Sequence, residues 1–450
     1  MKLNYKRTIL VGFAFFLICA FWQAYDNTIP LILTNKFGMS QTWSGIIMAA
    51  DNVLALFLLP FFGALSDRTN TKIGRRMPFI LGGTAAAVIL MNLLPLFDNG
   101  YANGASTGKL AMFVVTLGLL LVALGTYRSP AVALMPDVTP KPLRSKANAV
   151  INLMGSAGGI IVLALGMVFA TASVSNSMMS YTGYFGVIAA LMLAALVVFM
   201  LTVREPEWAK EMQAQSVAAG IEDAEETDHP NEGRKLSADE VKSLLLILLS
   251  IVLWFFGYNA VTSKYSVYAS NILHKDYNLT LIIAQAAAIA AYLPVGFIAG
   301  KIGRKKTILA GVVMLTVAFG VAGFLTADSP AALMNAMFAL AGIAWATINV
   351  NSFPMVVELA SGGDVGKYTG FYYTASMAAQ VATPMVSGLL MDKFGMHVLF
   401  PYAAVFTALA FVTMLFVKHG DSREMPKQTA AAGTEDAGAI NNTVEELTND

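Results

Sequence analysis

The stretch GALSDRTNTKIGRR, residues 63–76, joins two apolar runs and ends in the basic pair Arg75 and Arg76. A shorter version, GFIAGKIGRK at residues 296–305, has the same place between apolar runs in the second half of the chain. Both segments combine glycines with clustered positive charge, which is typical of tight hairpins at a membrane surface. The sequence therefore predicts two related halves, each with a basic hairpin between hydrophobic helices.

The composition is that of a membrane protein. Hydrophobic residues make up 56% of the chain and charged residues 13%, and the mean hydropathy is +0.63. Soluble domains carry about 25% charged residues, so this chain has too few charges to cover a water-exposed surface. We expect contact with the lipid bilayer and, at a net charge of +1, none with nucleic acid. The single cysteine, Cys19, excludes an intrachain disulfide.

The apolar runs predict the number of membrane helices, since each span needs about 20 mainly apolar residues. Twelve runs in two groups of six meet this requirement: 8–33, 42–66, 77–97, 109–136, 147–172, 181–203, 241–271, 280–300, 307–327, 330–357, 367–391 and 397–417. We expect an all-α integral membrane fold with six-helix bundles over residues 1–203 and 241–418. Residues 204–240 are polar and acidic and predict a linker, and 419–450 predict a disordered tail.

The basic residues of the loops predict the orientation of the chain. Twelve lysines and arginines lie in loops on the side of residues 63–76, and four lie in loops on the other side. Cytoplasmic loops carry such an excess of positive charge. We expect a monomeric, multi-pass protein of the plasma (inner) membrane, with both termini and the linker in the cytoplasm.

The two halves repeat in detail as well as in outline. An offset of 233 residues relates Gly63 to Gly296 and Tyr25-Asp26 to Tyr258-Asn259, an offset of 229 relates Gly74 to Gly303, and an offset of 221 relates Arg128 to Asn349 and Asp137 to Glu358. Six helices repeated in the same orientation predict a pseudo-twofold axis along the membrane normal.

These features resemble the major facilitator superfamily over nearly the whole chain. The family signature after the second helix, G-x-x-x-D-R/K-x-G-R-R/K, is matched by Gly63, Asp67, Arg68, Gly74, Arg75 and Arg76, with four extra residues before Gly74. Residues 67–80, DRTNTKIGRRMPFI, are similar to the branch of sucrose–proton symporters, solute carrier family 45 and glycoside–pentoside–hexuronide symporters. Two departures stand out. Leu59 replaces the aspartate of sodium-coupled melibiose-type carriers, and Arg128 lies about one turn farther from Asp137 than the arginine of sucrose carriers.

The resemblance implies a proton-coupled sugar symporter that works by alternating access, with no enzymatic activity and no cofactor beyond the proton gradient. It also implies a cytoplasmic gate formed by Gly63, Asp67, Arg68, Gly74, Arg75, Arg76, Asp137, Arg304 and Glu358. Asp67 is expected to accept from backbone amides at the start of the eleventh helix. Arg75 or Arg76 is expected to pair with Asp137, and Arg304 with Glu358. A simpler interpretation is that these cations only mark the cytoplasmic side.

Three charged residues lie deep within predicted spans: Asp26, Asp51 and Arg128. An ionisable group near the bilayer centre costs at least roughly 2.5–3.5 kcal/mol on insertion scales, so each indicates a function. We predict that they couple transport to protons, with Asp26 as the first candidate for the proton carrier and Asp51 sharing the proton or pairing with Arg128. The alternative is a static buried ion pair that fixes the helix register.

A sugar pocket needs amides for the hydroxyl groups and flat aromatic rings for the C–H face of the sugar. Side chains of these kinds recur on the predicted spans: Tyr25, Asn27, Tyr127, Tyr258, Asn259, Gln285, Trp345, Asn349, Asn351, Tyr372, Tyr373 and Gln380. We predict that they bind the substrate, although ordinary packing explains any single aromatic equally well. Lys264, far along the seventh span, is expected to reach the membrane interface.

Other classes of function stay open. A proton-coupled drug or metabolite antiporter of the same fold would favour a cavity rich in Met and Phe, and the 24 methionines are compatible with that. A transport-inactive membrane sensor would need a long ordered cytoplasmic domain. The four histidines lie in loops or at helix ends and suggest no metal site, and residues 296–301 lack the spacing of a nucleotide-binding loop.

Overall fold

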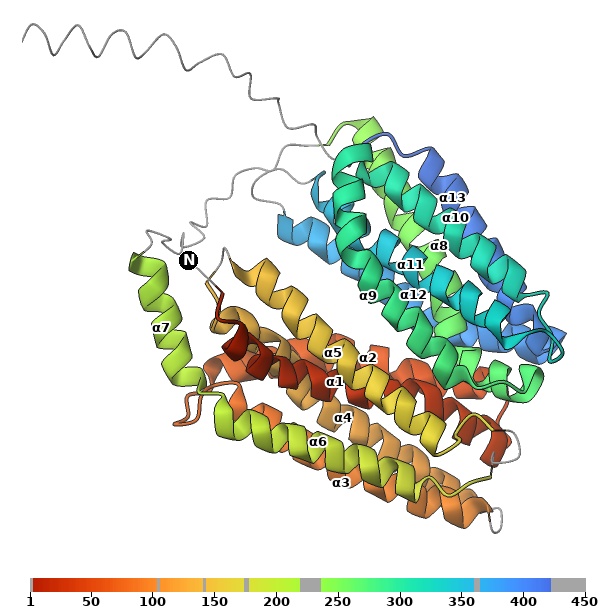
Figure 1. The fold of residues 1–450 in the computed structure, drawn as a ribbon, viewed down its shortest axis with the longest axis horizontal. Helices are drawn as coiled ribbons and strands as arrows, with labels where there is room; N and C mark the ends of the chain where they lie inside the picture. Colours follow the sequence, from red (N-terminus) through yellow and green to blue (C-terminus); the bar gives the residue numbers. More distant parts are fainter. Residues whose placement is uncertain are drawn as a thin grey trace, which may run out of the picture.

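The computed structural model describes residues 3–102, 106–140, 143–173, 178–218, 236–359 and 365–421. Within these residues every regular element is a helix. Six long helices from the first half form one bundle and six from the second half form another, and the bundles lie side by side (Figure 1). The predicted all-α fold with twelve long helices is therefore confirmed for the described part of the chain.

The N-terminal bundle accounts for the first six predicted spans. Its helices are α1 (Tyr5–Leu31), α2 (Gln41–Arg68), α3 (Met77–Ala102), α4 (Thr107–Asp137), α5 (Arg144–Val168) and α6 (Thr182–Thr202). One apolar core holds them together, in which the rings of Phe21, Phe113 and Tyr184 are almost completely buried.

The C-terminal bundle has its own core and accounts for the other six spans. Its helices are α8 (Ala238–Tyr268), α9 (Tyr277–Ile302), α10 (Arg304–Ala322), α11 (Ala331–Val357), α12 (Val365–Phe394) and α13 (Leu399–Leu415). Ser237 and Glu240 start α8 with a capping box, in which each side chain accepts from the backbone amide of the other residue. Trp254, Tyr265 and Phe400 are fully buried in the core.

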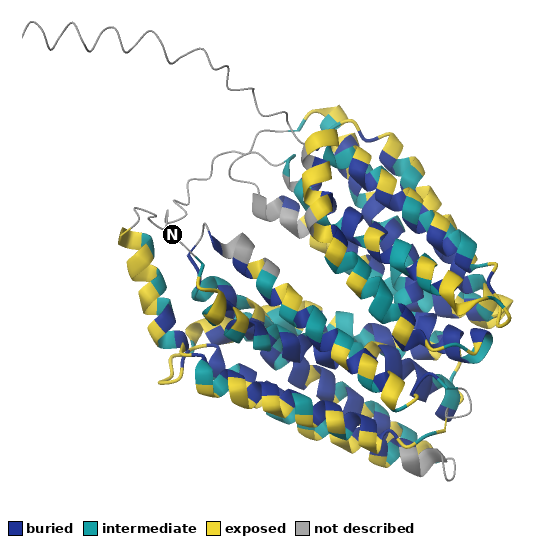
Figure 2. Cartoon of the chain, in the orientation of Figure 1, coloured by how far each residue is buried: buried dark blue, intermediate teal, exposed yellow. Residues whose placement is uncertain are grey.

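The helix surfaces are those of a membrane protein. Among the described helices, ten are long and apolar enough to cross a membrane; α9 has a shorter apolar stretch, Tyr277–Tyr292, and α12 is long but more polar. Exposed residues cover the outer faces of both bundles (Figure 2), and large apolar side chains are among them, such as Phe324 at 87% exposure. An apolar surface of this extent requires contact with lipid.

The two bundles meet at one end and diverge toward the other (Figure 1). We call the end next to Arg76, α7 and Asp421 the linker face, and the end next to Asn35, Gln41 and Asp392 the opposite face. Polar bonds join the bundles at the opposite face. Asn35 and Asn271 exchange amide hydrogen bonds of 3.3 and 2.9 Å, and the Thr171 and Tyr277 hydroxyls lie 2.9 Å apart. In this conformation the bundles are therefore closed together at the opposite face.

Short π-helical turns extend the first helix of each bundle toward this contact. They cover Ile32–Lys36 after α1 and Ala269–Leu273 after α8, so they lie at matching places of the repeat and carry Asn35 and Asn271. Such turns are rare and are often found at functional sites. Lys36, at the end of the first turn, is buried in an ion pair with Asp98 at 2.7 Å.

A further helix, α7 (Glu205–Ala218), begins in the predicted linker and was not expected from the sequence. It packs on the N-terminus of the chain, where the Arg7 guanidinium lies 5.1 Å from the centre of the Trp208 ring and pairs with Glu211. Residues 219–235 of the predicted linker and 422–450 of the predicted tail lie outside the described residues.

Lys264 differs from the sequence-based expectation. Its side chain is fully buried instead of reaching the membrane interface, and Nζ donates a 2.8 Å hydrogen bond to the backbone oxygen of Gln41. The reason is that α2 of the other bundle begins beside this part of α8 and offers a carbonyl to the buried ammonium group.

Candidate functional site

A cavity of about 390 Å³ lies between the bundles, at the middle of the long helices. The N-terminal bundle contributes α1 and α5 to its wall, and the C-terminal bundle contributes mainly α8, α9 and α11. Small residues on α5 leave room for it. A Cβ atom at Gly159 would lie 3.1 Å from the Gln23 side chain and 3.3 Å from that of Gln285.

A second cavity of about 240 Å³ shares Trp22, Asp26 and Thr262 with the first. The three deep charges predicted from the sequence, Asp26, Asp51 and Arg128, all line it. They come from α1, α2 and α4, so the fold brings together residues that are far apart in the sequence.

These charges are not neutralised by one another. Among the described residues Arg128 has no carboxylate oxygen within the 4.0 Å of an ion pair, and its guanidinium carbon lies 5.2 Å from the centre of the Trp22 ring. The Asp51 carboxylate accepts a 2.8 Å hydrogen bond from Asn52, and Asp26 is exposed to the cavity. Among the described residues the structure therefore has neither the predicted pairing of Asp51 with Arg128 nor the static ion pair of the alternative interpretation. Charges held apart in this way are costly at mid-membrane and are available to a proton or a ligand.

Three buried polar atoms on the cavity walls lack a hydrogen-bond partner among the described residues. They are Nε1 of Trp22, Oε1 of Gln285 and Nδ2 of Asn259. Buried polar atoms in proteins are almost always paired, so each of these atoms marks a place where a ligand or water can bond. Two are donors and one is an acceptor, which suits a ligand with hydroxyl groups.

The remaining walls combine amide and aromatic groups. The rings of Tyr258 and Trp345 stack in parallel, with centres 3.7 Å apart and planes inclined by 3°. Across the cavity Gln285 donates a 2.5 Å hydrogen bond to Gln23, which joins α9 of one bundle to α1 of the other. The cavity thus offers a flat apolar wall beside groups that form hydrogen bonds.

Half of the predicted substrate-binding residues lie on the cavity walls. Asn27, Tyr258, Gln285 and Trp345 line the first cavity, and Asn259 and Gln380 line the second. Asp26 and Asn259, which the repeat relates, therefore face the same space.

The other six predicted residues are not on these walls. Tyr25 and Tyr127 belong to the core of the N-terminal bundle, Asn351 and Tyr372 are buried inside the C-terminal bundle, and Asn349 and Tyr373 lie away from both cavities. They were predicted from their residue type and from their depth within the spans. Whether a side chain reaches the cavity also depends on which face of its helix it occupies.

Several cavity residues were missed by the sequence analysis. Cys19, Trp22 and Gln23 lie seven, four and three residues before Asp26 on α1, and Asn152 and Ser156 are four residues apart on α5. Residues three, four and seven apart share one face of a helix. The helical spacing before Asp26 is therefore a sequence signal that identifies Cys19, Trp22 and Gln23 as residues on the same face of α1.

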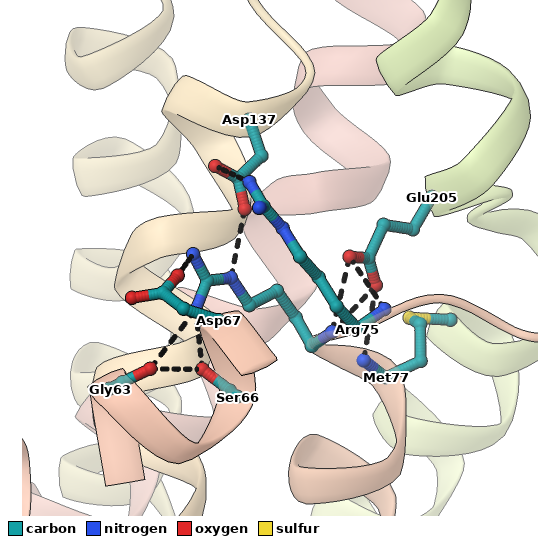
Figure 3. Close-up of polar contacts among 8 residues, drawn as sticks. Gly63, Ser66, Asp67, Arg75, Met77, Asp137 and Glu205 are labelled. Atoms are coloured by element: carbon teal, nitrogen blue, oxygen red, sulfur yellow. Dashed lines mark hydrogen bonds and ion pairs between the residues drawn. The ribbon is translucent and has the colours of Figure 1, made fainter. Parts of the chain in front are cut away.

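The hairpin at residues 63–76 forms a dense polar cluster at the linker face (Figure 3). Asp137, at the end of α4, binds Arg75 at 2.7 Å and Arg76 at 2.8 Å, so both predicted pairs are present. Arg76 also pairs with Asp67 at 2.5 Å and donates to Ser66 and to the Gly63 oxygen. Its side chain is only 5% exposed, so it is the centre of the cluster.

The second half repeats part of this arrangement. Arg304 pairs with Glu358 at 2.9 Å, as predicted, but the two side chains are 26% and 29% exposed. Arg68, the remaining predicted gate residue, lines a polar cavity of about 670 Å³ between the hairpin and α7.

Among the described residues Asp67 pairs with Arg76, within its own bundle, and its side chain is 56% exposed. The loop before α12, residues 360–364, lies outside the described residues, so the predicted bond to that helix stays a prediction.

Each hairpin requires a glycine, because the residue has a positive φ and a carboxylate lies close beside it. Gly74 and Gly303 both have positive φ, +124° and +93°, which favours glycine. Glu205 accepts from the amides of Arg75, Arg76 and Met77 at the start of α3, and a Cβ on Gly74 would lie 2.2 Å from this carboxylate. Asp421 occupies the same place at the start of α10, where it accepts from the amides of Arg304 and Lys305. The carboxylate oxygens thus cap helices whose first amides are free.

Two six-helix bundles around a central cavity that holds charged and amide side chains define a membrane transporter. The chain belongs to the major facilitator superfamily, whose family model ("Major Facilitator Superfamily") matches residues 11–291 and 247–444.

Among curated proteins, the chain is 33% identical over 151 residues to sucrose transport protein SUC3 of Arabidopsis thaliana, covering 30% of this chain and 25% of that protein. It is 27% identical over 180 residues to the putative glycoside/cation symporter YagG of Escherichia coli, covering 40% and 38%. The match therefore spans between a quarter and two fifths of these relatives.

Among solved structures, the xylose transporter XylE of E. coli in an inward-open conformation aligns with a TM-score of 0.66 at 15% identity, covering 92% of this chain and 97% of that one. At this identity the likeness supports the fold and not the substrate.

Proposed function

We propose that this protein is a secondary active transporter that carries a sugar, a disaccharide or glycoside, together with protons by alternating access. The observation that carries the proposal is the central cavity, where Asp26, Asp51 and Arg128 form no ion pair among the described residues and lie beside amides and a Tyr258–Trp345 stack. The similarity to sucrose and glycoside transporters favours a sugar over other small molecules.

In this mechanism the aromatic rings, the polar atoms and the charged residues of the cavity have different roles. The Tyr258–Trp345 wall would hold the C–H face of a sugar ring, and the free atoms of Trp22, Asn259 and Gln285 would bind its hydroxyl groups. Asp26 would carry the proton. Its neighbours Asp51 and Arg128 act in opposite directions, because a second carboxylate favours protonation of Asp26 and a guanidinium opposes it. A bound sugar that changes this balance couples the two fluxes.

The composition of the walls favours this proposal over drug antiport. A drug cavity was expected to be rich in methionine, yet Met48 is the one methionine among the described residues that line the two cavities. Drug efflux stays the second candidate, because Phe319 and Phe338 make part of the first cavity apolar.

In this proposal the orientation of the protein in the membrane is taken from the loop charges. We assign the linker face to the cytoplasm because basic residues concentrate there, and we expect a plasma (inner) membrane location. The conformation described above is then closed toward the outside, and the two bundles diverge toward the cytoplasm (Figure 1).

Uptake into proteoliposomes tests the proposal. The purified protein should accumulate a radiolabelled disaccharide or glycoside when a proton gradient is imposed, and a proton conductor should abolish the accumulation. Absence of sugar uptake, together with gradient-driven movement of a lipophilic cation, would replace the proposal by the antiport alternative.

A further inference from the structure

Near the opposite face, the end of α12 caps the start of α2 in the other bundle. The Asp392 carboxylate accepts hydrogen bonds of 2.8 Å from the backbone amides of both Gln41 and Thr42, and it also accepts from the Thr42 hydroxyl. The first amides of a helix have no partner within that helix and carry partial positive charge, so an anion is stabilised there. Here the anion belongs to the other half of the protein.

A buried lysine from the same half, Lys264, binds the backbone carbonyl group of Gln41. Nζ of Lys264, on α8, donates to the Gln41 carbonyl oxygen at 2.8 Å, and the Lys264 side chain has 0% exposure. The peptide groups around Gln41 are therefore held on the amide side by Asp392 and on the carbonyl side by Lys264. Burying an ammonium is costly unless it is paired, and the Gln41 carbonyl oxygen supplies a partner for the Lys264 ammonium.

Glycines on both helices allow this contact. A Cβ atom on Gly388 of α12 would lie 2.4 Å from the Gln41 oxygen, and one on Gly45 of α2 would lie 2.1 Å from the Pro384 oxygen. Helices approach closely in membranes where such small residues face one another. The two bundles therefore fit together here at backbone distance, with no room for larger side chains.

At the linker face, the carboxylate at the other end of α2 has a partner in its own bundle. Asp67 pairs with Arg76 there, and the loop before α12 lies outside the described residues. Among the described residues, the bonds from a carboxylate of α12 to α2 are therefore those at the opposite face.

We propose that Asp392 and Lys264, with the backbone of Gln41 and Thr42, form an outer lock. The lock stabilises the conformation that is open at the linker face, and it breaks when the cavity opens at the opposite face. This inference rests on alternating access as proposed above, but it does not depend on the identity of the substrate. Both residues act by positioning the bundles and touch no ligand.

The test measures the conformational equilibrium without substrate. In a Cys19→Ser background, spin labels on Thr107→Cys and Asp328→Cys report the separation of the bundles at the opposite face, and labels on Lys72→Cys and Lys301→Cys report the linker face; all four positions are exposed. Pulsed electron-spin distance measurements then give the population of each conformation in nanodiscs.

Asp392→Asn should shift the ratio of the two populations by about tenfold, because the lock loses charge-assisted hydrogen bonds. For the labels at the opposite face, the population with a long separation should increase. For the labels at the linker face, the population with a short separation should increase. Lys264→Met should shift the ratio in the same direction. Thr42→Val removes only the hydroxyl contact and should give a smaller shift in the same direction. This variant provides the test if Asp392→Asn and Lys264→Met fold poorly.

Ser237→Ala is the control. Ser237 caps the start of α8 at the linker face, where it accepts from the Glu240 amide at 3.3 Å, and both residues belong to one bundle. Its loss should lower the thermal stability without changing the distances. If Asp392→Asn behaves like this control, with lower stability and unchanged distributions, the lock is refuted. Because no sugar is present, failure of the sugar proposal would leave this result unaffected.

Discussion

Replacement of Gly74 by alanine affects two features of the hairpin at once. The residue has φ = +124°, a conformation that costs a residue with a side chain roughly 1–3 kcal/mol. The new Cβ atom would also lie 2.2 Å from Oε2 of Glu205, so the carboxylate must move away from the amides it caps. A hydrogen bond to a charged group contributes about 1.5–3 kcal/mol, so partial loss of this cap adds about 2 kcal/mol. We expect Gly74→Ala to lower the free energy of unfolding by about 3–5 kcal/mol.

A double-mutant cycle separates the two contributions. In a Glu205→Ala background the clash is absent, and Gly74→Ala should cost only the backbone strain, so the cycle should give a coupling of about 2 kcal/mol. The free energies come from urea titrations in detergent micelles. Gly118→Ala is the control, since this glycine lies inside α4 with no atom within 4 Å of a Cβ, and it should be neutral or stabilise by about 0.5–1 kcal/mol. Equal costs of Gly74→Ala in both backgrounds would refute the explanation of this glycine.

Other consequences follow from the cavity and the gate. Gln23→Ala should raise the KM of sugar uptake about tenfold, since it removes an amide from the cavity and leaves Gln285 without its partner. An unchanged KM would exclude Gln23 from the binding site. Trp345→Ala should weaken sugar binding by about 1–3 kcal/mol by removing the flat wall, measured by substrate protection against thermal unfolding. Arg76→Gln should cost about 1.5–3 kcal/mol of stability because it removes the charged hydrogen bonds of a buried guanidinium to Asp137. Arg304→Gln, in a more exposed pair, should cost less than about 1 kcal/mol; similar costs would contradict the importance of burial.

The sequence predicted the fold well because the signals for it are local. Each span is visible as an apolar run, and the repeat of Gly74 at Gly303 predicted two hairpins that indeed share a positive φ and a capping carboxylate. The acid–base pairs at Asp137 and Glu358 follow from the same repeat, because charges at helix ends have few other partners near a membrane surface.

The site was predicted less completely, since it depends on contacts between distant segments. Asp26 was found because charge is rare in a membrane helix, but Trp22 and Gln23 carry no such signal. Lys264 was assigned to the interface by its depth alone, and only the packing of α2 on α8 makes its burial possible. No role was predicted for Asp392, because its partners lie some 350 residues away in the sequence.

Proton-driven uptake by an Asp26→Asn variant tests the central claim most directly. Asparagine keeps the size and polarity of the side chain but cannot exchange a proton, so the variant should still catalyse sugar exchange between the two sides of a proteoliposome membrane. It should fail to accumulate sugar when a proton gradient is imposed, while the wild-type protein accumulates it. Accumulation by the variant at the wild-type level would contradict the assignment of Asp26 as the proton carrier, and with it the proposed coupling mechanism.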